Sequence, residues 1–198
     1  MTEGKPFRTI ALFAIPMILS NLFQQLYNVI DTLIVGNRLG QSALAAVGSA
    51  GSITAVFVQL ATGLALGGSI VISQYFGAGK TDRIRVCATT SAIFSGIIGL
   101  VSAVFIWIFA EPLLIWVKTP EEIVPMGVAY LNFYFLGSVP VFVYNALSSV
   151  YTALGNSGTP LKFLVISSVA NVVLDLWFIV GLHWGIAGAA AATALSQV

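Results

Sequence analysis

The chain has 198 residues, of which 58% are hydrophobic and 8% are charged, and its formal net charge is +1. A soluble domain carries about a quarter charged residues, so this composition excludes a water-soluble fold. The single cysteine, Cys87, excludes an internal disulfide, and with the single histidine, His183, it leaves no cluster suited to zinc, iron or copper. We therefore expect no cofactor and no redox chemistry.

Long apolar runs separated by turn clusters predict a series of membrane-spanning helices. Each span needs about 20 mostly apolar residues to cross about 30 Å of hydrocarbon. Strands are not expected, because the runs are much longer than the strands of a membrane barrel and open sheet edges cannot lie in lipid. The predicted spans are 9–35, 43–76, 86–109, 123–153 and 160–180, with a sixth from 186 that is incomplete at 198. The expected fold is an all-α integral membrane protein, a helical bundle of five complete spans and a truncated sixth.

The positive charges predict the orientation of this bundle. With the N-terminus in the cytoplasm, most basic residues fall on the cytoplasmic side, as multi-pass proteins prefer. The cytoplasmic set is Lys5, Arg8, Lys80, Arg83, Arg85 and Lys162, and the outer set is Arg38 and Lys118. On this interpretation the basic loop after the second span is a topology signal and does not imply nucleic-acid binding. Since the sixth helix stops part-way across the membrane, we expect the chain to be a fragment of a longer protein.

Two carboxylates, Asp31 and Asp175, fall inside predicted spans. The other acidic residues lie at helix ends or in loops: Glu3, Asp82, Glu111, Glu121 and Glu122. A charged carboxylate in mid-membrane costs about 2.5 to 3.5 kcal/mol, so such residues are rare and face a cavity or a partner. Both lie at a similar distance from the outer ends of their spans, which predicts one common level. The alternative is a protonated aspartic acid bonded to a neighbouring helix.

Further oxygen-bearing side chains fall at this level. Asn171 stands one helical turn before Asp175, and Tyr27 one turn before Asp31. Thr193 lies at the same depth in the sixth span. If the first, fifth and sixth helices pack together, these five residues converge in a pocket of oxygen ligands suited to a proton or a hard cation such as Na⁺. Ordinary interhelical hydrogen bonding is the alternative role for Asn171 and Thr193.

Prolines, glycines and aromatic residues add expectations about packing. Pro16 and Pro140 lie inside spans, where they remove helix hydrogen bonds and are expected to kink or soften the helix. Gly63 and Gly67, with Gly68 beside them, allow close packing of the second span. Aromatic residues of the fourth span either face lipid or line a cavity; they are Tyr130, Phe133, Tyr134, Phe142 and Tyr144.

Several short motifs together resemble the MATE (multidrug and toxic compound extrusion) family of transporters. The early motifs are Ile15-Pro16-Met17, Gln25, Asn28, Asp31-Thr32, Gly36 and the LAAVG of 44–48. The later motifs are the GNSGTP of 155–160, the segment from Asn171 to Asp175, and the GIAGAA of 185–190. The resemblance extends from Phe7 to Val198, and the combination is specific although each piece alone is weak.

This resemblance implies a transporter of two six-helix bundles that exchanges organic cations for Na⁺ or protons across the membrane. The chain would be the N-terminal lobe, its missing C-terminal lobe would be its partner, and the lobe alone should not transport. The resemblance also assigns Asp31, Asn171, Asp175 and Thr193 to the family's cation or proton site. Tyr27 and Pro16 match a residue beside that site and one proposed to bend the first helix.

We interpret the chain as part of a secondary active multidrug efflux antiporter of the plasma membrane, surrounded by lipid and acting on small organic cations. A flippase for lipid-linked oligosaccharides is one alternative, but its anionic substrates favour basic residues inside spans, and here Arg38 and Lys162 lie only at the ends. A non-transporting scaffold is another, and it would tolerate Asp31→Asn. An enzyme is not expected, because the lone His183 lies in a loop and no nucleophile has a base beside it.

Overall fold

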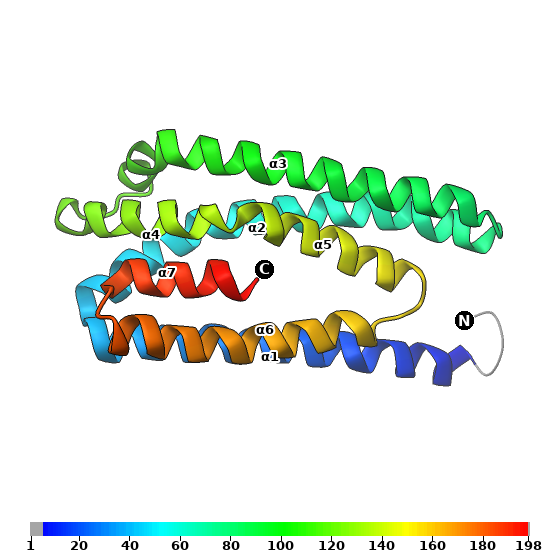
Figure 1. Ribbon diagram of the computed structural model, residues 1–198, viewed down its shortest axis with the longest axis horizontal. Helices are drawn as coiled ribbons and strands as arrows, with labels where there is room; N and C mark the ends of the chain where they lie inside the picture. Colours follow the sequence, from blue (N-terminus) through cyan, green and yellow to red (C-terminus); the bar gives the residue numbers. More distant parts are fainter. Residues whose placement is uncertain (1–5, 198) are drawn as a thin grey trace.

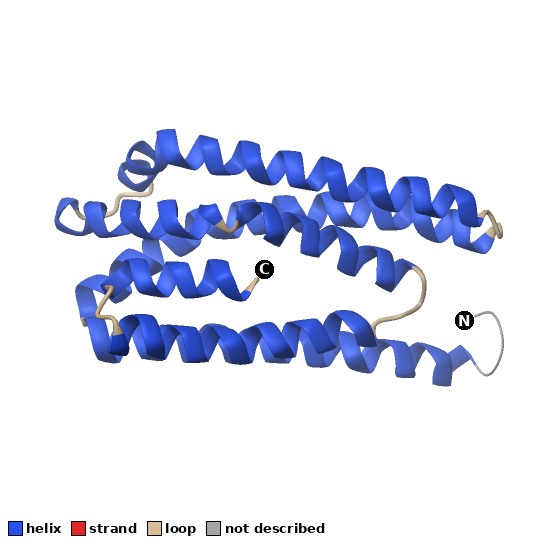
Figure 2. Ribbon diagram, viewed as in Figure 1, coloured by secondary structure: helices blue, strands red, loops and turns tan. Residues whose placement is uncertain are grey.

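The computed structural model describes residues 6–197, which form helices joined by short loops, with no strand in that range (Figure 2). The elements are α1 (Pro6–Leu39), α2 (Gln41–Gly77), α3 (Thr81–Trp116), η1 (Glu121–Ile123), α4 (Val124–Leu136), α5 (Ser138–Ala153), α6 (Gly158–Asp175), η2 (Leu176–Gly181) and α7 (Gly185–Ser196). Here η1 is a short 3-10 helix and η2 is a π-helix that continues α6.

The described helices confirm the predicted membrane bundle. Four are long and apolar enough to cross a membrane, and the bent pair of α4 and α5 makes a fifth span. The last helix, α7, has 12 residues and is too short for a complete span. Several helices extend beyond the predicted apolar runs; α3, for example, covers 81–116 rather than 86–109. Val198, the last residue of the predicted sixth span, lies outside the described residues.

The span predicted as one helix over 123–153 is divided at Gly137. There α4 and α5 meet at an angle of 51°. Pro140 has no backbone N–H, and its ring cannot coexist with a helical carbonyl at Leu136, so a straight helix cannot pass through this point. The Ser138 hydroxyl stabilises the bend by donating to the Gly99 carbonyl of α3 at 2.8 Å. The kink expected from Pro140 is therefore centred three residues before it.

Pro16, the other proline expected to kink a span, lies within a single uninterrupted helix, α1. The Ser20 hydroxyl donates to the Pro16 carbonyl at 2.9 Å, one turn further along the same helix. The structure therefore shows α1 as continuous through Pro16, and a role of Pro16 in bending or softening the helix stays a prediction.

The helices pack in two groups, with α2 to α5 in one and α1, α6 and α7 in the other (Figure 1). The groups meet mainly where α4 lies against α7. Leu131 and Phe135 of α4 form the centre of the first group, packed on Ile106 and Leu114 of α3. Because lipid tails are as apolar as these side chains, helix association in a membrane rests on close contact rather than on the hydrophobic effect.

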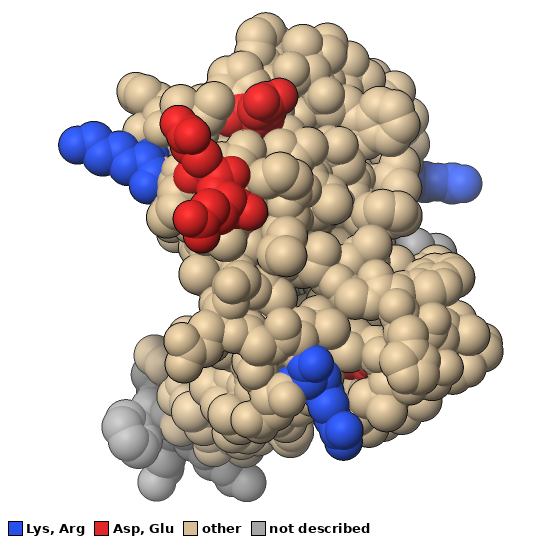
Figure 3. Space-filling model, turned by 90° about the vertical axis from the view of Figure 1, so that its left-hand side faces the viewer, with Lys and Arg blue, Asp and Glu red and all other residues tan. Residues whose placement is uncertain are grey.

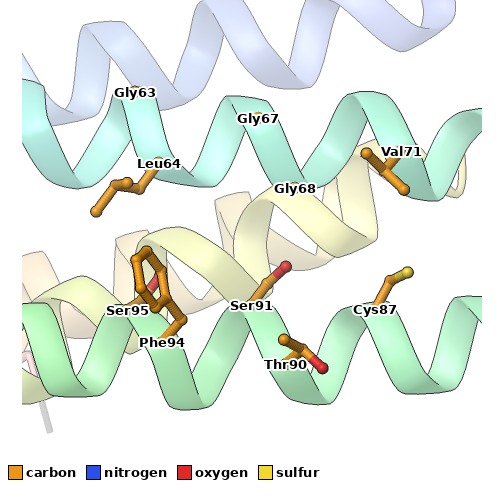
Figure 4. Close-up of a pocket in the computed structure, with 10 residues that line it drawn as sticks. All are labelled: Gly63, Leu64, Gly67, Gly68, Val71, Cys87, Thr90, Ser91, Phe94 and Ser95. Carbon is orange, nitrogen blue, oxygen red and sulfur yellow. The ribbon is translucent and has the colours of Figure 1, made fainter.

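Glycines of α2 show where such close contact occurs. A Cβ atom at Gly68 would lie 2.7 Å from the Ser91 hydroxyl oxygen of α3, whereas one at Gly63 or Gly67 would meet nothing within 4 Å. Of the three glycines expected to allow close packing, only Gly68 lies at a close helix contact in this structure. All three glycines border a groove of about 410 Å³ between α2 and α3 (Figure 4).

Charged residues lie at the two ends of the bundle. The antiparallel helices place Lys80, Arg83, Arg85 and Lys162 at one end and Arg38 and Lys118 at the other. Acidic side chains also gather at this second end (Figure 3), where Glu111, Glu121 and Glu122 are exposed. Lys5 and Glu3 lie outside the described residues. This separation fits the predicted orientation, and which end faces the cytoplasm stays a prediction.

Candidate functional site

A cavity of about 820 Å³ opens between the two groups of helices. Its wall is built from α1, α2, α4, α5 and α7, together with the start of α6. Asp31 is the one carboxylate among the residues that line it, and this lining holds no lysine or arginine. The cavity therefore offers a solute many neutral hydrogen-bonding groups and a single negative charge.

The two intramembrane carboxylates lie together at the wall of this cavity. Asp31 of α1 is half-buried and lines the cavity, whereas Asp175, at the end of α6, is fully buried behind it. The two side chains are within hydrogen-bonding reach of each other. Oδ1 of each has no hydrogen-bond partner within residues 6–197. Two carboxylates in such contact repel each other unless a proton or a cation lies between them.

Asn171 fixes the position of Asp175. Its side chain is 1% exposed, and the hydrogen-bond network favours the amide orientation in which Nδ2 donates to Asp175 Oδ2 at 2.9 Å. In that orientation the amide oxygen accepts from the backbone N–H of Thr193 at 3.2 Å. Both polar atoms of the amide are then engaged within the protein, so Asn171 holds α6 against α7 at the carboxylate pair.

Thr193 and Tyr27 complete the cluster. The Tyr27 hydroxyl donates to Thr193 Oγ1 at 3.4 Å, and Thr193 Oγ1 donates in turn to the Ala189 carbonyl at 3.1 Å. The structure thus brings together all five residues that the sequence analysis selected for one pocket, on α1, α6 and α7. Pro16 lies apart from them, about 22 Å before Asp31 along α1.

The donor set suits a proton or a hard monovalent cation. It consists of two carboxylates and neutral oxygen atoms, the ligand type that such ions prefer over sulfur or imidazole. Among the residues that the structure describes, no three His, Cys, Asp or Glu side chains lie together as a metal cluster. The unpartnered Oδ1 atoms of Asp31 and Asp175 are the acceptors left free for an ion.

Several side-chain amides that face the cavity were not selected from the sequence: Asn21, Gln24, Gln59 and Asn145. With Asn28, which the family motifs include, the α1 amides follow a spacing of three and four residues and so form one polar stripe on an apolar helix. That stripe was a usable signal. Asn145, Ser148 and Thr152 of α5 also follow a spacing of three and four residues and line the cavity, so α5 carried a similar signal. Gln59 of α2 has only Thr62 as a polar neighbour on the next turn, which is a weaker indication.

The aromatic residues of the bent span divide between cavity, core and lipid. Tyr130, Tyr134 and Tyr144 line the cavity. Phe142 is 2% exposed within the packed helices, and Phe133 is 41% exposed on the outer surface. Some of these aromatic residues therefore line the cavity, and others pack in the core or face outward, so both of the expected alternatives occur.

A multi-pass helical membrane protein with a polar, solute-sized cavity is the class that this architecture defines. Within that class, the chain belongs to the MatE family, whose model matches residues 16–177. It is 36% identical to the probable multidrug resistance protein YpnP of Bacillus subtilis and 31% identical to the probable multidrug resistance protein YoeA of the same organism. Each alignment covers 99% of this chain and 44% of the relative.

Solved structures agree with this assignment. The outward-facing conformation of a multidrug resistance MATE family transporter matches with a TM-score of 0.91 and 30% sequence identity. That match covers 98% of this chain and 43% of the other. The chain therefore spans less than half the length of the relatives that it matches, and the resemblance to the MATE family seen in its motifs is confirmed.

Proposed function

We propose that this chain is the N-terminal lobe of a secondary active multidrug efflux antiporter, which exports organic cations in exchange for Na⁺ or H⁺. Membership of the MatE family and the names of the relatives, which are multidrug resistance proteins, support the transport of drugs. A second lobe, which completes the transport path, is the partner implied by the length of those relatives.

The contact of Asp31 with Asp175 at the cavity wall carries the coupling part of this proposal. Asp31 is reached from the cavity, and Asp175 lies behind it with its position held by Asn171. A coupling ion bound between the two carboxylates neutralises their repulsion. When an organic cation leaves Asp31, the ion takes its place, and the entry of the ion down its concentration gradient drives the exchange. Exchange of one monovalent cation for another moves no net charge, so the concentration gradient of the ion supplies the work, about 1.4 kcal/mol for each tenfold ratio.

The lining of the cavity supports cationic rather than anionic substrates. A lipid-linked pyrophosphate would meet the carboxylate of Asp31 and no lysine or arginine among the lining residues. The cavity therefore disfavours the flippase alternative on charge. Neutral amides and hydroxyls around the wall can bind substrates of varied shape without a fixed geometry.

Ion-dependent stability tests this proposal in the purified full-length protein. An ion that binds only the folded state raises stability by RT ln(1 + [L]/Kd), about 2.7 kcal/mol at a hundred-fold excess over Kd. We expect Na⁺, or a change of pH, to shift the thermal unfolding of the wild type. Asp31→Asn and Asp175→Asn should lose that shift, and Glu111→Gln, which alters an exposed carboxylate at a helix end, should keep it. An equal response in all four proteins would refute the assignment.

A further inference from the structure

Two tyrosines of α4 present an aromatic surface to the cavity. The rings of Tyr130 and Tyr134 are stacked, with centroids 5.9 Å apart and planes inclined by 23°. Tyr130 is 7% exposed, so its ring is almost covered. Tyr134 is half-buried and lines the cavity, so part of its side chain can be reached by a solute.

The Tyr134 ring is held in place from behind. It packs on Phe135 with centroids 5.6 Å apart and planes at 61°. Phe135 is 1% exposed and makes an edge contact with Phe57 of α2, at 4.9 Å and 81°. A ring fixed in this way loses little conformational freedom when a ligand stacks on it, so more of the stacking energy contributes to binding.

The hydroxyl of Tyr134 has no hydrogen-bond partner among the described residues, unlike those of two other tyrosines in the cavity wall. The hydroxyls of Tyr27 and Tyr144, in the same wall, donate to Thr193 and to the Pro160 carbonyl. In the described part of the chain, neither Tyr130 nor Tyr134 makes a hydrogen bond through its hydroxyl. No hydrogen bond within the described residues therefore ties the Tyr134 side chain in place, and its packing rests on the contacts of its ring.

Asp31 supplies the charge that complements this ring. Asp31 lines the same cavity, and it is close enough for its charge to act on the Tyr134 side chain. An aromatic face beside a carboxylate fits a flat ring system that carries a positive charge, because the ring stacks while the charge is neutralised. A compact aliphatic cation can use the carboxylate but has no ring to stack.

We propose that Tyr134 is a specificity-determining residue, which makes the cavity favour flat aromatic cations over aliphatic ones. This inference rests on the proposed function, since it takes the cavity to be a binding site for cations. Tyr134 sets the preference, and Asp31 is needed by both kinds of cation.

The test compares the binding of two probes, ethidium and tetraethylammonium, to the purified full-length protein. Tyr134→Leu should weaken ethidium binding about five- to tenfold and tetraethylammonium binding less than about threefold, because only ethidium loses a stacking partner. Tyr134→Phe keeps the ring and should bind both probes like the wild type. Phe133→Leu, on the outer surface of the same helix, is the matched control for folding and should also be unchanged.

Two results would overturn the inference: an equal loss for both probes in Tyr134→Leu, or no loss for ethidium. Failure of the wild type to bind ethidium would do so as well. Asp31→Asn separates these outcomes from failure of the proposed function. If tetraethylammonium binding depends on Asp31, the cation site stands whatever Tyr134 does; if neither probe depends on Asp31, the proposed function itself is wrong.

Discussion

The Tyr27 hydroxyl of α1 donates a 3.4 Å hydrogen bond to Thr193 Oγ1 of α7, across a sequence separation of 166 residues. Asn171 of α6 contacts Thr193 as well, through the backbone N–H in its favoured orientation. Thr193 is therefore the point at which α1, α6 and α7 meet beside the two carboxylates. A change in the position of any one of these helices alters the geometry of the proposed ion pocket.

Tyr27→Phe should weaken this junction without changing any charge. We expect the free energy of unfolding to fall by about 0.5 to 1.5 kcal/mol, the usual contribution of one hydrogen bond. Unfolding in SDS gives this quantity for the full-length protein. Tyr75→Phe, a half-buried tyrosine near the far end of α2, is the control and should have little effect. Equal stability of the two variants would show that the Tyr27 contact is not formed.

Asn171→Ala should affect the ion pocket more strongly than Tyr27→Phe. It removes the amide that donates to Asp175 Oδ2 at 2.9 Å, a hydrogen bond to a buried carboxylate worth about 1.5 to 3 kcal/mol. The apparent affinity for the coupling ion should fall at least tenfold when transport is measured against ion concentration. Asn37→Ala, at an exposed position near the end of α1, should leave that affinity unchanged. Similar ion affinities in the two variants would contradict the positioning role of Asn171.

Gly137→Ala should destabilise the bend between α4 and α5. An added Cβ would lie 2.7 Å from both Cα and Cβ of Ala194, and part of that contact is backbone, which cannot move aside cheaply. We expect a loss of about 1 to 3 kcal/mol in unfolding free energy, as for other overpacked sites. Gly67→Ala, with open space around it, should be neutral or stabilising by up to about 1 kcal/mol. If the Gly137→Ala and Gly67→Ala proteins had the same free energy of unfolding, the close approach of Gly137 to Ala194 would be disproved.

Ser138→Ala should also weaken the bend. The hydroxyl oxygen lies 2.8 Å from the Gly99 carbonyl and 2.7 Å from the Phe135 carbonyl, so its single hydrogen is shared between them and joins α3 to the break in the helix. Its removal leaves a buried carbonyl with one fewer donor, and we expect a cost of about 1 kcal/mol. Ser102→Ala removes a hydroxyl that bonds only within its own helix, to the Ile98 carbonyl, and should cost less. Thermal unfolding of the two variants side by side measures the difference.

The sequence was sufficient to predict the membrane bundle and the meeting of the carboxylates. Apolar runs define spans because the thickness of the bilayer fixes their length. Asp31 and Asp175 could be placed at one level because their distances from the span ends were similar. The one-turn spacing of Asn171 from Asp175 put both on the same helical face.

Other features depend on contacts that no local pattern records. Pro140 indicated a kink, but the close approach of Ala194 on α7 to Gly137 is a contact between distant parts of the chain that no local pattern predicts. Tyr134 could not be assigned to the cavity, because α4 is strongly apolar and its one amide, Asn132, does not form a polar stripe that marks the orientation of the helix. Gly63 and Gly67 have the spacing of a packing motif, yet a Cβ atom at either position would meet nothing within 4 Å.

The most direct test of the central claim is gradient-driven transport of ethidium into inverted vesicles that contain the full-length protein, with Na⁺ and pH gradients applied separately. The account predicts transport by the wild type with one of the two gradients, which identifies the coupling ion. It predicts that Asp31→Asn and Asp175→Asn remain folded in the membrane and lose this transport. Wild-type transport by both variants would contradict the account.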